Sequence, residues 1–188
     1  MFLILVSFFY AANCNTSYTE ELNIRTLDAK NRPLANVSIT VYYQLSSSTG
    51  KGYATTNPKL TAENGTMYIK IQNLEEQEGH LDCNVKIMAN YGGEYAEKTV
   101  TANAHPSLID LKLDVYTLVV TVKDQNNAKL EGALISSDLF EAYTNKDGWA
   151  SLRLGTGEKT LYTRYRGAEA EDKISFYEDM NYEVSFFL

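Results

Sequence analysis

The sequence predicts an all-β protein built from two tandem antiparallel β-sandwiches of seven strands each. Three observations lead to this prediction. Apolar side chains alternate with polar ones through most of the chain, which is the pattern of half-buried strands. Short segments rich in Gly, Asn and Asp separate the alternating runs, as expected of tight turns. The same series of strands and turns also occurs twice within the 188 residues.

Three pairs of similar segments define the repeat. They match residues 26–39 to 122–135, 61–71 to 144–154, and 91–100 to 165–174. The offset between the two copies falls from 96 to 83 to 74 residues, so the second copy has shorter connections between equivalent strands. Because surface loops tolerate deletion better than strands do, this is the pattern of a duplicated domain with trimmed loops.

The N-terminal segment precedes both copies. Residues 1–14, MFLILVSFFYAANC, carry no charge and are mostly apolar. The run is too short to span a bilayer but suits a secretory signal, so we expect a signal or anchor segment and a secreted or cell-surface protein. Cys14 is a candidate for lipidation, which would provide membrane attachment through the N-terminus, or for a disulfide with Cys83. A buried first strand and a mis-assigned start are the alternatives.

The alternation places strands in both copies. In the first copy, Leu22 and Ile24 share the inward face of one strand, and Val37 and Ile39 share that of the next. In the second copy, seven strands are expected at residues 117–123, 132–137, 140–144, 149–154, 158–166, 169–176 and 181–187. Many short strands separated by regular turns are typical of an antiparallel sandwich.

A break in the alternation marks the boundary between the copies. The apolar residues occupy odd positions from Ile109 to Val115 and even positions from Leu118 onward. An uninterrupted strand cannot change its buried face, because its side chains alternate strictly. We therefore expect one sandwich domain in residues 18–115 and a second in residues 116–188. No Gly-, Pro- or Ser-rich linker separates them, so they should sit end to end with limited freedom.

The most motif-like residues are expected to be turn residues, at equivalent places in the two copies. They are Asp28, Asn31 and Gly65 in the first copy, and Asp124, Asn127 and Gly148 in the second. The aspartates can accept hydrogen bonds from the backbone two residues on, and asparagine tolerates left-handed dihedral angles. A glycine that follows Asn or Asp supplies the positive φ that a tight hairpin needs.

These turn residues also carry a family resemblance. The run DAKNRPLANV at residues 28–37, followed by TAENG, resembles the carboxypeptidase regulatory-like domain, whose signature is V-x-D-x-x-G-x-P-L-x-G-A. The second copy fits with VKDQNNAKLEGA at residues 122–133, but it has Lys129 where the family prefers proline. The resemblance covers residues 18–188. It implies an Ig-like, transthyretin-like sandwich of about seven strands that serves as an accessory module.

Composition and motifs argue against several classes of function. The net charge is −7 and no basic patch is present, which argues against nucleic acid as a partner. His80 and His105 have no nucleophile motif or second ligand pair around them, so we expect exposed loop histidines, no catalysis, no metal and no cofactor. Tyr165-Arg166-Gly167 resembles the C-terminal motif of a transthyretin-like hydrolase of purine breakdown, but it lies before the terminus and lacks a matching N-terminal histidine.

Exposed tyrosines are the feature that could carry a binding function. The chain has 14 Tyr and 7 Phe, and a tyrosine ring suits both a sheet face in water and an interface. The candidate binding residues are the tyrosines on or near outward phases and one arginine: Tyr42, Tyr68, Tyr95, Tyr162 and Arg166. The alternative is that tyrosine is simply a good strand former. Three sequons are candidate glycosylation sites, at Asn15, Asn36 and Asn64.

The sequence therefore predicts a non-catalytic secreted or cell-surface module that binds or spaces, with a cell-surface protein or polysaccharide as its partner. A first alternative is a structural subunit of a surface filament or layer, which would self-assemble when a terminal strand pairs with the open edge of a neighbour. A second alternative is a hydrolase on the transthyretin-like scaffold.

Overall fold

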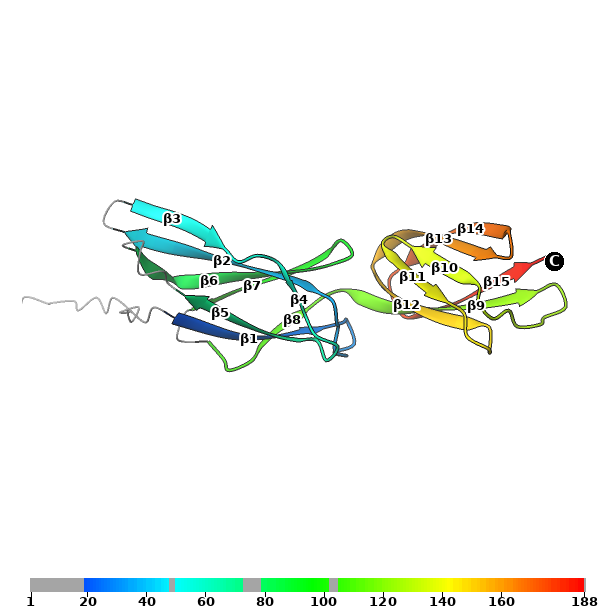
Figure 1. The fold of residues 1–188 in the computed structure, drawn as a ribbon, viewed down its shortest axis with the longest axis horizontal. Helices are drawn as coiled ribbons and strands as arrows, with labels where there is room; N and C mark the ends of the chain where they lie inside the picture. Colours follow the sequence, from blue (N-terminus) through cyan, green and yellow to red (C-terminus); the bar gives the residue numbers. More distant parts are fainter. Residues whose placement is uncertain (1–18, 48–49, 73–78, 102–104, 188) are drawn as a thin grey trace, which may run out of the picture.

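The structure is a computed structural model that describes residues 19–47, 50–72, 79–101 and 105–187. These residues form strands and turns, arranged as two β-sandwiches that lie end to end (Figure 1). No helix among them is long and apolar enough to cross a membrane. The predicted signal segment with Cys14 and the sequon at Asn15 lie outside the described residues, and so does the side chain of Cys83.

In the part of the chain that the structure describes, the N-terminal sandwich contains eight strands. They are β1 (Thr19–Leu27), β2 (Ser38–Ser47), β3 (Gly50–Thr55), β4 (Lys59–Leu60), β5 (Thr66–Gln72), β6 (Gly79–Tyr91), β7 (Glu94–Thr101) and β8 (Ile109–Lys112). One sheet has the order β5-β1-β8 and the other β3-β2-β6-β7, with β4 also paired to β2. The sequence predicts seven strands. The additional one arises because Asn57-Pro58 separates β3 from β4, and proline has no N–H to donate to the neighbouring strand.

The C-terminal sandwich contains seven strands. They are β9 (Val115–Asp124), β10 (Leu134–Ser137), β11 (Phe140–Tyr143), β12 (Trp149–Gly155), β13 (Gly157–Tyr165), β14 (Ala168–Phe176) and β15 (Met180–Phe186). The sheet orders are β12-β9-β15 and β11-β10-β13-β14, so each sheet corresponds to one in the N-terminal sandwich. Neighbouring strands run antiparallel, except that the first and last strands of each sandwich pair in parallel, β1 with β8 and β9 with β15.

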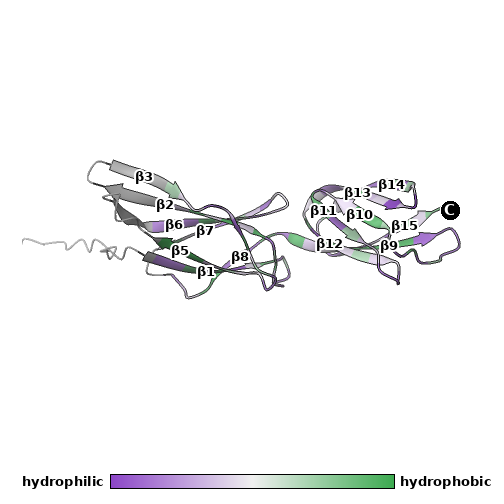
Figure 2. Ribbon diagram, viewed as in Figure 1, coloured by the Kyte–Doolittle hydropathy of each residue, from purple (hydrophilic) through white to green (hydrophobic). Residues whose placement is uncertain are grey.

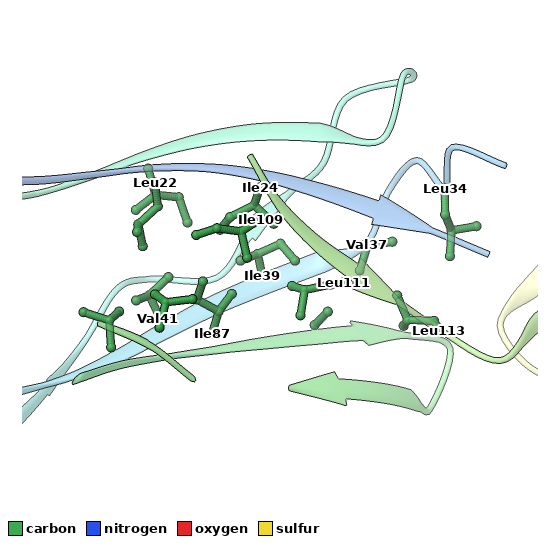
Figure 3. Close-up of a cluster of buried hydrophobic side chains, with 14 of the residues drawn as sticks. Leu22, Ile24, Leu34, Val37, Ile39, Val41, Ile87, Ile109, Leu111 and Leu113 are labelled. Carbon is green, nitrogen blue, oxygen red and sulfur yellow. The ribbon is translucent and has the colours of Figure 1, made fainter. Parts of the chain in front are cut away.

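Each sandwich closes around its own cluster of buried side chains. Hydrophobic residues alternate with hydrophilic ones along the strands (Figure 2), so each sheet has one apolar face. The cluster in the N-terminal sandwich includes Leu22, Ile24, Ile39, Ile87 and Ile109 (Figure 3). The cluster in the C-terminal sandwich includes Leu118, Val120, Ile135, Leu154 and Phe176. Burial of each side chain of this size contributes about 1.5–3 kcal/mol, which makes the two clusters the main source of stability.

The turn that follows the first strand has the same geometry in both copies. Oδ1 of Asp28 accepts hydrogen bonds of 2.9 Å from the backbone N–H groups two and four residues on. Oδ1 of Asp124 does the same at 2.8 Å. Asn31 and Asn127 have φ of 62° and 63°, in the left-handed region that asparagine tolerates. Each turn is therefore held by one carboxylate and one left-handed asparagine.

Two hairpin glycines pack against the backbone of that first strand. Gly65 and Gly148 have φ of 73° and 72°. A Cβ at Gly65 would lie 2.7 Å from the carbonyl oxygen of Thr26, and one at Gly148 would lie 2.9 Å from that of Val122. Both the dihedral angle and the space therefore require glycine.

Candidate functional site

Strand β9 takes part in both sandwiches and joins them without a linker. Val115, at its start, is buried in the N-terminal cluster, whereas Leu118 is buried in the C-terminal cluster. The carbonyl of Val115 accepts a hydrogen bond of 3.2 Å from the N–H of Ala29 in the N-terminal sandwich. Val115 also pairs with Gly155 of β12 in the C-terminal sandwich. The backbone at the junction is therefore bonded on both sides.

A network of charged side chains connects the β1–β2 loop to the C-terminal sandwich. Nε of Arg32 contacts the Asp28 carboxylate at 2.6 Å. The same guanidinium donates to Oγ1 of Thr117 at 3.0 Å and to Oδ1 of Asp179 at 3.3 Å. Asp179 also accepts a hydrogen bond of 2.8 Å from the N–H of Thr117 and pairs with Lys30 at 3.0 Å. Arg32 and Asp179 thus tie a loop of one sandwich to a strand and a loop of the other.

The protonation states in this network favour the observed contacts. The pKa of Arg32 is raised, mainly by its hydrogen bond to Asp28. Burial raises the pKa of Asp179, but the N–H of Thr117 and the side chains of Lys30 and Arg32 outweigh that effect, so the pKa lies below its ordinary value. Both groups are therefore charged at neutral pH.

Aromatic contacts connect the β6–β7 hairpin to the C-terminal sandwich. Tyr91 stacks on Phe140 with ring centroids 4.8 Å apart and an interplanar angle of 22°. A Cβ at Gly92 would collide with the Phe140 ring, so glycine leaves room for this contact. Glu94 in the same hairpin accepts a hydrogen bond of 3.3 Å from the hydroxyl of Thr156. The junction is therefore held by loops from both sheets of the N-terminal sandwich.

A hollow of similar size lies on the outer face of one sheet in each sandwich. The first hollow, of about 400 Å³, is lined by outward side chains of β2, β6 and β7: Ser38, Thr40, Tyr42, Met88, Asn90 and Tyr95. The second hollow, of about 390 Å³, is lined by outward side chains of β10, β13 and β14: Leu134, Ser136, Tyr162, Arg164 and Glu169. Volumes of about 300–1,000 Å³ are typical of small-molecule sites.

The two hollows occupy equivalent positions in the repeat. Strand pairing forms one row of side chains across the first hollow: Ser38, Asn90 and Tyr95. It forms the corresponding row across the second hollow: Leu134, Arg164 and Glu169. A second row joins Thr40 to Met88 in one copy and Ser136 to Tyr162 in the other. The hollow is therefore a property of the duplicated sheet.

The side chains lining the two hollows differ in charge. Those of the first hollow are all neutral, with hydroxyl, amide, thioether and aromatic groups. Next to it, Lys86 and Glu97 form an ion pair with each other at 2.6 Å. The second hollow contains an ion pair of its own, since Nε of Arg164 lies 2.7 Å from Oε1 of Glu169. The same frame thus presents a neutral surface in one copy and a charged one in the other.

The five candidate binding residues do not form one site. Tyr42 and Tyr95 line the first hollow and Tyr162 lines the second. Tyr68 lies on β5 in the other sheet, where its hydroxyl bonds to the Glu21 carboxylate and its pKa is raised by that contact. Arg166 lies in the β13–β14 turn with φ of 46°, and its guanidinium lies 5.1 Å from the ring centroid of Tyr165.

The remaining lining residues, among them Ser38, Thr40 and Asn90, were not predicted. Their only signal in the sequence is an outward phase within a strand, which many polar residues share. Asn36 and Asn64, the two sequon asparagines within the described residues, are both exposed in turns. At Asn64, Oδ1 accepts a hydrogen bond of 2.7 Å from the hydroxyl of Thr66.

His105 differs from the exposed loop histidine that the sequence suggests. Its ring is only 12% exposed, and Nε2 contacts the carboxylate of Glu20, which is buried at the start of β1. Nδ1 lies 2.9 Å from the carbonyl oxygen of Pro106. The imidazole therefore links the loop before β8 to β1. The side chain of His80 lies outside the described residues.

No protein-family model matches this chain, and no curated protein matches it. Among solved structures, it is 12% identical to a point mutant of the shaft pilin spaA from Lactobacillus rhamnosus GG, covering 88% of this chain and 96% of the pilin with a TM-score of 0.48. It is 13% identical to a streptococcal ancillary pilin, covering 91% of this chain with a TM-score of 0.39, and it spans only 62% of that pilin. It is 12% identical to the minor pilin of Streptococcus agalactiae, covering 88% and 94% of the two chains with a TM-score of 0.30.

Proposed function

We propose that the chain is a non-catalytic module, secreted or attached to the cell surface, that binds a surface partner and holds it at a fixed distance. It consists of two carboxypeptidase regulatory-like domains, residues 18–115 and 116–188, joined as one stiff unit. The junction is the observation that carries this proposal. A chain that only needed two independent binding domains would have no use for a shared strand, an ion-pair network and an aromatic stack between them.

Two of the residues that form the junction are not repeated at the equivalent positions of the second copy. The position equivalent to Arg32 in the second copy is Ala128, which has the same turn but no side chain that could reach a neighbour. Likewise, Gly92, which admits the Phe140 ring, is replaced by Arg166 in the second copy. These differences support a fixed pair of domains with a defined order.

Two of the sheet edges favour a monomeric module over the alternative of a self-assembling subunit. Strands β7 and β14 form edges of their sheets within the described structure. Both carry charged side chains at several positions: Glu94, Glu97 and Lys98 on β7, and Glu169, Glu171 and Lys173 on β14. Charges on an edge strand oppose pairing with a second copy.

A hydrolase is supported least. The described residues contain no group of three or more His, Cys, Asp or Glu side chains that could hold a metal ion. Both ring nitrogens of His105 lie within hydrogen-bonding distance of protein oxygens, so its imidazole is already engaged in the contact between the loop before β8 and β1.

Sedimentation velocity over a wide range of concentrations tests the proposed function. We expect a single elongated monomer at all concentrations. Growth of larger species with concentration would favour the filament or layer subunit instead. Export is tested by the mass and N-terminal residue of the native protein, which should show cleavage or modification close to Cys14. An unmodified chain that still begins at Met1 and remains inside the cell would contradict it.

A further inference from the structure

The first hollow lies on the outer face of a sheet, over β2, β6 and the edge strand β7, and its floor is made of backbone that is already paired. Its floor is formed by β2, which pairs with β3, β4 and β6, and by β6, which pairs with β2 and β7. A peptide that binds by adding a strand needs an open edge with free N–H and C=O groups. A ligand in this hollow must instead be recognised through side chains.

Those side chains suit a neutral ligand rich in hydroxyl groups. The hydroxyls of Ser38, Thr40, Tyr42 and Tyr95 make no hydrogen bond to any described residue. Oδ1 of Asn90 accepts a long bond of 3.4 Å from the backbone at Gly93, which leaves the amide nitrogen available. The residues Tyr42 and Tyr95 are 38% and 66% exposed, and tyrosine combines a flat apolar face with a polar tip. Sugar rings offer both matching surfaces, apolar C–H faces and a rim of hydroxyls.

Because the first hollow has no net charge, it suits a neutral ligand better than an acidic or basic one. No lining side chain is charged, and the adjacent Lys86 and Glu97 neutralise each other. The charged groups of an acidic or basic polymer would lose hydration at this surface without gaining a side chain of opposite charge.

Tyr42 and Tyr95 are too far apart for both to contact the same sugar ring. Tyr95 lies in the row of Ser38, two strands away from β2, and Tyr42 lies four residues farther along β2. With about 3.3 Å per residue and about 4.8 Å between strands, their Cα atoms are roughly 16 Å apart on the diagonal. A ligand that contacts both rings is therefore an extended chain of several units.

We infer that the first hollow binds a linear, neutral polysaccharide, with Tyr42 and Tyr95 stacking on sugar rings at its two ends. This inference rests on the binding function proposed above and names its ligand class. The second hollow should not bind the same ligand, because the positions of Asn90 and Tyr95 are taken there by the Arg164–Glu169 ion pair. The chain therefore contains its own comparison site.

The test is binding of the full chain to neutral hexasaccharides of glucose, mannose, galactose or N-acetylglucosamine, measured by calorimetry beside hexagalacturonate. At least one neutral sugar should bind with a 1:1 stoichiometry. Tyr42→Ala and Tyr95→Ala should each raise its Kd about tenfold or more, because a few aromatic anchors dominate such surfaces. Tyr162→Ala, in the second hollow, and Tyr68→Ala, on the other sheet, are matched controls that should bind as the wild type does. Thermal melting of all four variants checks that they are folded.

Three outcomes would overturn the inference: no neutral sugar binds, hexagalacturonate binds more tightly, or Tyr42→Ala and Tyr95→Ala bind like the wild type. None of these would disprove the proposed function, which is judged by the elongated monomer and by the stiffness of the junction. If the chain proved flexible or self-assembling but still bound sugar through Tyr42, the proposed function would fail and the inference about the first hollow would stand.

Discussion

Replacing Gly148 with alanine should destabilise the second copy more than any change in exposed surface would. Alanine at φ of 72° costs about 1–2 kcal/mol. The added Cβ would also lie 2.8 Å from Cβ of Lys129 and 2.9 Å from the carbonyl oxygen of Val122, so the hairpin must move. That movement weakens two backbone hydrogen bonds of Val122. Its N–H donates to the carbonyl of Gly148 at 2.8 Å, and its carbonyl accepts from the N–H of Leu130 at 3.0 Å. At about 1 kcal/mol for each bond, the total is about 3–4 kcal/mol.

Gly167→Ala is the matched control. Gly167 has φ of 89°, but no atom lies within 4 Å of its added Cβ, so only the dihedral strain of about 1–2 kcal/mol applies. Urea unfolding followed by tryptophan fluorescence measures both variants, because Trp149 is the one tryptophan of the chain and lies on β12 in the second copy. Circular dichroism checks the same midpoints. If Gly148→Ala cost no more than Gly167→Ala, the close approach of the hairpin to β9 would be wrong.

Three further results are expected. Thr163→Val should raise the free energy of unfolding by about 1 kcal/mol, because the Thr163 hydroxyl is buried with no hydrogen-bond partner in the described structure. A loss of stability in urea unfolding would count against this. The junction should loosen as the pH falls below about 3.8, because the lowered pKa of Asp179 means that its charge stabilises the folded form above the unfolded pKa and is lost on protonation. Interdomain distances followed on acidification from about pH 7 until the carboxyl groups are protonated measure this, and a distribution that stays unchanged throughout would refute it. Residues 116–188 alone should give a β-rich circular dichroism spectrum, because they contain the whole second cluster; a disordered spectrum would refute the domain division.

The alternation of side chains predicted most strands because each strand has one buried face. In the second copy the expected run at residues 149–154 appears as Trp149–Gly155, and the run at 169–176 appears as Ala168–Phe176. The break in phase falls between Val115 and Leu118, where the chain passes from one buried cluster to the other. Local pattern is sufficient for such features because each depends on residues close together in the sequence.

The contacts that carry function depend on residues far apart, and no local pattern could predict them. Arg32 and Asp179 are separated by 147 residues. The first hollow needs the register of three strands, which brings Ser38, Asn90 and Tyr95 into one row. An outward phase shows only which face a tyrosine lies on, so Tyr68 and Tyr42 looked equivalent although they lie on different sheets.

Pulsed electron paramagnetic resonance measures directly how stiff the junction is. Spin labels are placed at the exposed Glu63 and Glu131, one in each copy, in a chain whose two cysteines have been replaced by serine. We predict one narrow distance distribution for this chain, and a broad one when Arg32→Ala and Phe140→Ala are combined. A broad distribution before the junction is altered would show that the two sandwiches move independently.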